Sequence, residues 1–88
     1  MSLEKYRNQI NEIDLELLKL INKRAELAIK ISEVKQIKGL PVYIPEREQS
    51  VLARLTENNP GPLSATGITN IFAKIIETCR QLEFAQID

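Results

Sequence analysis

Arg24 and Lys35 are the charged residues whose positions first suggest chemistry. Apolar side chains recur at an alternating spacing of three and four residues from Leu3 to Val34, and Arg24 stands where that spacing predicts an apolar residue. Lys35 follows 11 residues later, almost three helical turns, so on a helix both cations project from nearly the same side, about 16 Å apart. Two long cationic side chains at this separation could hold a small dianion between them.

Both cations also have structural explanations that the spacing leaves open. Arg24 could set the register of two packed helices, or it could extend along the surface to reach water. Lys35 could be a solvated lysine that interacts with the negative end of a helix dipole. Taken alone, each position fits a structural role at least as well as an anion site.

Two glutamates extend the apolar faces of other segments. Glu83 lies four residues after Cys79, on the same helical face. Glu48 lies on the same side of its segment as Val51, while Arg47 points more sideways. Each of these charges could instead be a solvated surface group. If they face a common site, they add hydrogen-bonding groups of both signs.

The residue types that the chain lacks exclude several common kinds of catalysis. The chain has no histidine, so the commonest general base, the commonest zinc ligand and the Ser-His and Cys-His nucleophile pairs are missing. It also lacks the glycine-rich phosphate-binding patterns. Arginine, lysine and carboxylates suit electrostatic stabilisation of a substrate better than covalent catalysis.

Charge and cysteine content bear on partners and location. Lysine plus arginine and aspartate plus glutamate each number 12, so there is no basic excess to attract nucleic acid or an anionic membrane. The apolar runs are short, and the N-terminus does not resemble a signal peptide. The single cysteine, Cys79, excludes an internal disulfide and fits a reducing compartment. These features predict a cytoplasmic protein.

Three helices are needed to position these residues. Residues 3–38 contain no proline or glycine, and Gly39 with Pro41 ends the first helix. Pro45 begins a short second helix over residues 45–58. Ser64 can cap a third helix of medium length over residues 65–86. We therefore predict an all-α fold with a single domain over residues 1–88.

The first helix is too long for one small chain to cover. About 36 residues span roughly 54 Å, whereas 88 residues form a globule only about 30 Å across. An intertwined homodimer would cover the exposed apolar side chains. Arg7 lies about 42 Å from Lys35 along the helix, so both cannot hold one ligand within a subunit. If two first helices cross antiparallel near residue 17, Arg7 of one chain falls beside the region between Arg24 and Lys35 of the other.

The order and spacing of several short motifs resemble the all-helical class of chorismate mutases. The resemblance extends over nearly the whole chain, without an insertion. It rests on Tyr6-Arg7, Ile13-Asp14, Leu17-Leu18, Lys23-Arg24, Leu27-Ala28, Lys35, Pro41-Val42, Glu46-Arg47-Glu48 and the segment from Ile68 to Glu83.

The resemblance implies rearrangement of chorismate to prephenate, on the route to phenylalanine and tyrosine, without metal or cofactor. It implies that Arg24 and the partner's Arg7 bind the two carboxylates of the substrate, as bidentate arginines do. Lys35 would donate to the ether oxygen and to a nearby carboxylate. The reaction suits a site that has cations but no nucleophile.

The resemblance also assigns the remaining polar groups. Glu48 would accept from the ring hydroxyl, and Arg47 would hold Glu48 or a carboxylate in place. Glu83 stands where some members have glutamine, and it would donate to the ether oxygen, which a glutamate can do only when protonated. We therefore expect activity to fall as pH rises. Catalysis is thus assigned to Lys35, Glu83 and Arg24.

Two positions depart from the family pattern. Ile44 stands where the family often has aspartate, so its side chain cannot cap the second helix. Its backbone amide could still contact the substrate. Cys79 stands where a small hydroxyl residue can occur, and only its thiol or backbone could make that contact.

Two other functions remain as alternatives. Isochorismate pyruvate lyase shares this fold and a similar cationic site. A non-catalytic helical dimer could serve as a regulatory or docking domain, although the cations at positions 7, 24 and 35 argue against it. The sequence is compatible both with a stand-alone enzyme and with one domain of a fusion.

Overall fold

The computed structural model describes residues 2–87 and contains three helices. They are α1 (Leu3–Lys38), α2 (Pro45–Glu57) and α3 (Ala65–Phe84), and residues 2–87 contain no strand. The predicted all-α fold of long, short and medium helices is confirmed; the second and third helices end one and two residues earlier than predicted. None of these helices combines the length and apolarity needed to span a bilayer. The predicted single domain includes residues 1 and 88, which lie outside the described residues.

The ends of α1 and α3 follow from their capping residues. The Ser2 hydroxyl accepts from the Lys5 backbone N–H at 3.2 Å and so begins α1. Gly39, at φ 69°, ends α1 in the left-handed conformation that favours glycine. The Ser64 hydroxyl accepts from the Gly67 N–H at 3.0 Å, which confirms the predicted cap of α3. Local sequence therefore determines where both helices start.

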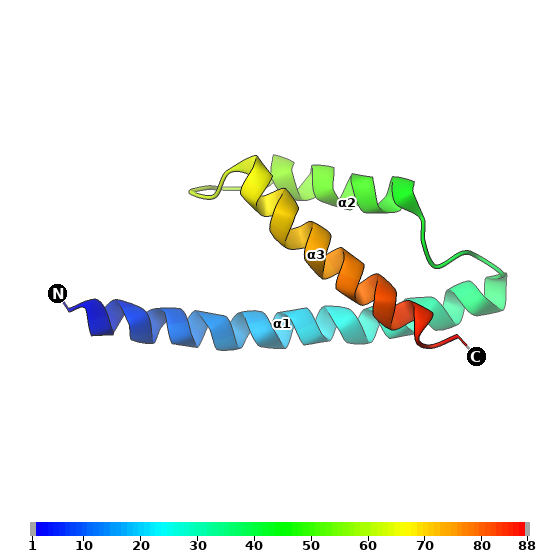
Figure 1. Cartoon of the computed structure of the whole chain (residues 1–88), viewed down its shortest axis with the longest axis horizontal. Coiled ribbons are helices and arrows are strands. Elements are labelled where there is room, and N and C mark those ends of the chain that lie inside the picture. Colours follow the sequence, from blue (N-terminus) through cyan, green and yellow to red (C-terminus); the bar gives the residue numbers. More distant parts are fainter. Residues whose placement is uncertain (1, 88) are drawn as a thin grey trace.

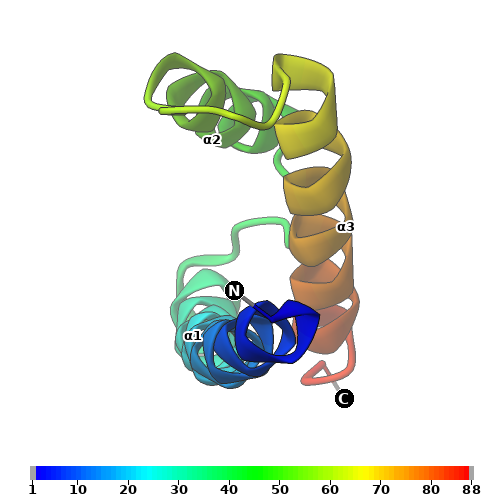
Figure 2. The same cartoon turned by 90° about the vertical axis from the view of Figure 1, so that its left-hand side faces the viewer.

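Helix α3 holds the other two helices together. It packs against both α1 and α2, whereas within residues 2–87 α1 and α2 do not pack on each other. Figure 1 shows α3 running diagonally from α2 to the C-terminal half of α1, while the N-terminal half of α1 extends beyond it. Viewed along α1, α2 and α1 lie at opposite ends of α3 and on the same side of it (Figure 2).

One chain buries little of its apolar surface. It measures 56 × 25 × 15 Å, and its radius of gyration is 16.1 Å, against about 12 Å for a globular domain of this size. The buried apolar side chains are few: Ala28, Val42, Ile76 and Cys79. A stripe of α1 side chains is 45–66 % exposed, and we call these residues the α1 stripe: Leu3, Tyr6, Ile10, Ile13, Leu17 and Leu20.

Candidate active site

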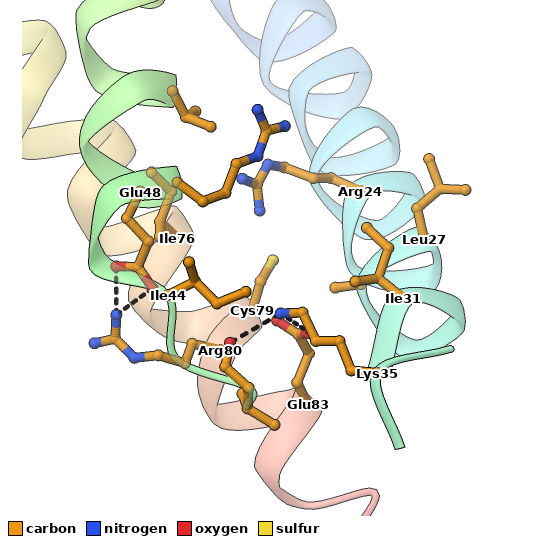
Figure 3. Close-up of a pocket in the computed structure, with 14 residues that line it drawn as sticks. Arg24, Leu27, Ile31, Lys35, Ile44, Glu48, Ile76, Cys79, Arg80 and Glu83 are labelled. Atoms are coloured by element: carbon orange, nitrogen blue, oxygen red, sulfur yellow. Dashed lines mark hydrogen bonds and ion pairs between the residues drawn. The ribbon is translucent and has the colours of Figure 1, made fainter. Parts of the chain in front are cut away.

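A pocket of about 370 Å³ lies between the three helices and the loop over residues 39–44 (Figure 3). Its wall brings together residues that are far apart in the sequence. Seven of the eight predicted site residues line it: Arg24, Lys35, Ile44, Arg47, Glu48, Cys79 and Glu83. Their roles in this pocket stay predictions.

Arg24 and Lys35 enter the pocket from the same face of α1, as their spacing predicts. Arg24 is half-buried and extends from α1 across the pocket (Figure 3). The Lys35 side chain is only 15 % exposed, so the interpretation of Lys35 as a solvated lysine is wrong. One helical face therefore presents two cations to the same space.

Lys35 is held by two acceptors. Its Nζ donates to Glu83 Oε1 at 3.1 Å and to the Val42 carbonyl oxygen at 2.8 Å (Figure 3). The first contact joins α1 to α3, and the second joins α1 to the loop before α2. The ammonium group is therefore fixed in place before any substrate binds.

Glu83 is buried, with 8 % of its surface exposed. The interpretation of Glu83 as a solvated residue at the end of α3 is therefore wrong. In the structure it accepts a hydrogen bond from the Lys35 ammonium group, a contact that an ionised carboxylate makes well. Donation by Glu83 to a substrate would require a proton on this carboxyl.

Helix α2 begins at the pocket. Ile44 is its N-cap and makes no side-chain cap, as predicted, while Pro45 occupies the first helical turn. The Ile44 carbonyl accepts from the N–H groups of Arg47 and Glu48 at 3.1 and 3.2 Å. This turn directs Glu48 into the pocket wall, where its side chain is 24 % exposed.

Arg80 is the partner of Glu48 and is not among the site residues predicted from the sequence. Arg80 Nη1 donates to both carboxylate oxygens of Glu48, at 2.5 and 2.7 Å. The Arg80 guanidinium carbon also lies 4.6 Å from the centroid of the Tyr43 ring. The hydrogen bond to Glu48 raises the pKa of Arg80, against the opposing effect of burial, so Arg80 stays charged at any working pH.

The resemblance implies that Arg47 holds Glu48 or a carboxylate, and the first of these roles is corrected by this contact. Arg47 lines the pocket but is exposed, and the guanidinium that pairs with Glu48 comes from α3 instead of α2. A signal for Arg80 was present in the sequence, since Ile76 lies four residues before it and Glu83 three residues after it. Both neighbours also line the pocket.

Cys79 and Arg7 differ in burial and in their position relative to the pocket. Cys79 is buried, with 5 % of its surface exposed, and it lines the pocket from α3. Arg7 is exposed near the start of α1 and does not line the pocket. A single chain therefore does not bring Arg7 to the other predicted site residues.

The charged groups of the lining are mostly cationic. Four cations and two carboxylates line the pocket, so the formal charge of the lining is +2 when all six groups are ionised. They are Arg24, Lys35, Arg47, Arg80, Glu48 and Glu83. Such a lining favours a small anion that carries two negative charges.

Comparisons with known proteins agree on one family. The sequence model described as chorismate mutase type II matches residues 6–84. The chain is 32 % identical to form II of the chorismate mutase from Thermus thermophilus, with a TM-score of 0.93 and coverage of 98 % of each chain. It is 33 % identical to the Helicobacter pylori chorismate mutase solved in complex with prephenate, with a TM-score of 0.88 over 96 % of this chain and 91 % of that one.

A curated relative is considerably longer than this chain. The bifunctional chorismate mutase/prephenate dehydratase of Aquifex aeolicus (strain VF5) is 35 % identical over 85 residues. The match covers 92 % of this chain but 24 % of that protein. The chain thus spans about a quarter of the length of this relative.

Proposed function

Because the chain belongs to the type II chorismate mutase family, we propose that it catalyses the rearrangement of chorismate to prephenate. The observation that carries the proposal is the pocket whose charged lining sums to +2. Chorismate is a dicarboxylate, so its charge complements this lining.

The reaction requires no nucleophile, because it breaks an ether C–O bond and forms a C–C bond within one molecule. The enzyme must hold a flexible dianion in a compact conformer. It must also stabilise the negative charge that develops on the ether oxygen as the C–O bond breaks ahead of C–C bond formation. Positioned cations and hydrogen-bond donors can do both.

Arg24 and Lys35 take the two central roles. Arg24 binds one substrate carboxylate through its planar guanidinium group. Lys35 donates to the ether oxygen and to a nearby carboxylate. Since Lys35 Nζ is already held by Glu83 and the Val42 carbonyl, little reorganisation is needed when charge develops in the transition state.

Glu83 supplies a second donor to the ether oxygen when its carboxyl is protonated. In the structure the Glu83 carboxyl accepts from the Lys35 ammonium group. The proposed mechanism therefore needs a proton on Glu83 while substrate is bound.

The other lining residues position the substrate. Glu48 accepts from the ring hydroxyl, and Arg47 binds a carboxylate at the pocket rim. Ile44 contacts the substrate through its backbone amide, and Cys79 does so through its thiol or backbone. These contacts orient the substrate without taking part in bond changes.

We further propose that the working unit is a twofold homodimer. The exposed α1 stripe and the 56 Å length of the chain support this, because a second copy would bury apolar surface that one chain leaves in water. Antiparallel crossing of two α1 helices would bring the partner's Arg7 between Arg24 and Lys35. The predicted cytoplasmic location and single domain stay predictions.

Chorismate consumption combined with a sedimentation mass tests this function. We expect conversion to prephenate by a species of twice the chain mass. Release of pyruvate from isochorismate would instead favour the lyase. A dimer that leaves chorismate unchanged would favour a regulatory or docking domain, and Arg24→Ala is the inactive control.

A further inference from the structure

We propose that Arg80 is a positioning residue, which orients Glu48 and neutralises its charge so that Glu48 can accept from the substrate hydroxyl. The inference rests on the proposed function, because it concerns how Glu48 meets the substrate. It assigns a role to a residue on α3 that does not itself need to touch the reacting atoms.

Arg80 is held in place by its helix and by contacts with two other residues. Its backbone belongs to α3, its guanidinium lies 4.6 Å from the Tyr43 ring centroid, and Nη1 donates to both oxygens of Glu48. Tyr43 belongs to the loop before α2, and Glu48 belongs to α2. Three separate elements therefore hold one charged pair, which restricts the rotamers of Glu48.

The hydrogen bonds leave Glu48 able to accept more donors. An ionised carboxylate has about four acceptor positions, and Arg80 occupies one on each oxygen. Figure 3 shows Arg80 meeting Glu48 at one end of the pocket, while Arg24 extends into the pocket from α1 on the opposite side. Glu48 can therefore keep Arg80 as its partner while it accepts from a hydroxyl in the pocket.

Charge gives Arg80 a second effect. The Glu48 and Arg80 side chains are 24 % and 25 % exposed, so water screens the pair only in part. Without Arg80, Glu48 would present an unneutralised negative charge to a dianionic substrate. Loss of Arg80 should therefore raise KM through repulsion and lower kcat through disorder of Glu48.

A simpler role for Arg80 is to fasten α2 to α3, and a double-mutant cycle separates the two roles. The cycle compares the parent, Arg80→Met, Glu48→Gln and the double variant. If Arg80 acts through Glu48, we expect Arg80→Met to lower kcat/KM by about 10- to 100-fold in the parent but by no more than about threefold in Glu48→Gln. The rise in KM should also disappear in the Glu48→Gln background.

A folding check and two control variants distinguish a loss of activity from a loss of folding. Helix content and sedimentation mass are compared for every variant. Arg80→Lys keeps the positive charge but not the planar guanidinium group, so it should recover part of the lost kcat/KM. Arg54→Met removes an exposed arginine on α2, outside the pocket lining, and should match the parent.

Independent losses that multiply in the double variant would overturn the inference, as would an Arg80→Met enzyme within about twofold of the parent. If Arg80→Met has a lower melting temperature but unchanged kcat and KM, Arg80 only stabilises the packing of α2 on α3, and the inference is wrong. A parent that does not convert chorismate would contradict the proposed function itself. If the parent converts chorismate and Arg80→Met has the same kcat and KM, only this inference is contradicted.

Discussion

Lys35 and Glu83 stand 48 residues apart in the sequence, yet Lys35 Nζ lies 3.1 Å from Glu83 Oε1. Their side chains are 15 % and 11 % exposed, so the contact is largely shielded from water. It connects the last turn of α1 to the last turn of α3, at the wall of the pocket. The two groups assigned to the ether oxygen are therefore neighbours and influence each other.

Replacement of Lys35 tests the central donor. We expect Lys35→Ala to lower kcat by about 10² to 10³, the usual effect of losing one preorganised donor. The control is Lys38→Ala, since Lys38 is an exposed lysine in the same turn of α1. Circular dichroism checks that both variants are folded, and near-parent turnover by Lys35→Ala would remove Lys35 from the mechanism.

The pH dependence of turnover tests the state of Glu83. A carboxyl can donate only in its protonated form, and that form is lost as pH rises. We therefore expect kcat to fall towards alkaline pH in the parent. Glu83→Gln should flatten the profile, because an amide donates at every pH. A parent rate that does not change with pH would contradict this role.

Mixed dimers test whether Arg7 acts across the subunit boundary. Arg7→Ala and Arg24→Ala should each lose most activity as pure proteins. When the two variants are refolded together, half of the dimers are expected to be mixed, and each mixed dimer contains one intact site, so activity should recover to about a quarter of the parent value. No recovery in a preparation shown to contain mixed dimers would mean that Arg7 does not complete the partner's site.

The N-cap of α2 offers a test of local stability. Ile44 makes no side-chain cap, whereas aspartate at this position can accept from the N–H groups of the first turn. We expect Ile44→Asp to be more stable than Ile44→Ala by about 1 kcal/mol. Denaturant unfolding at one fixed protein concentration measures the difference, and Ile44→Asn should show a similar gain. Equal stability of the aspartate and alanine variants would contradict the capping argument.

Much of the fold could be predicted from sequence because its determinants are local. The helical period of apolar side chains, Gly39 after α1 and Ser64 before α3 each act within a few residues. The same period correctly placed Arg24 and Lys35 on one face of α1. These features required no knowledge of how the helices pack.

The pairing of charges could not be predicted in the same way. The family resemblance implies Arg47 as a partner of Glu48, but Glu48 pairs with Arg80, which lies 32 residues away. Likewise, the burial of Lys35 and Glu83 depends on how α3 crosses α1. Spacing gives the direction of a side chain on its own helix, whereas its partner depends on the angle between helices.

The uninterrupted course of α1 restricts how this chain can change in evolution. Inserting one residue between Arg7 and Arg24 would rotate one cation by about 100° relative to the other and shift it by about 1.5 Å. Hence we expect natural variants to keep the length of this interval and to vary in length within loop 58–64 instead. In α1, the number of residues is then under selection alongside their identity.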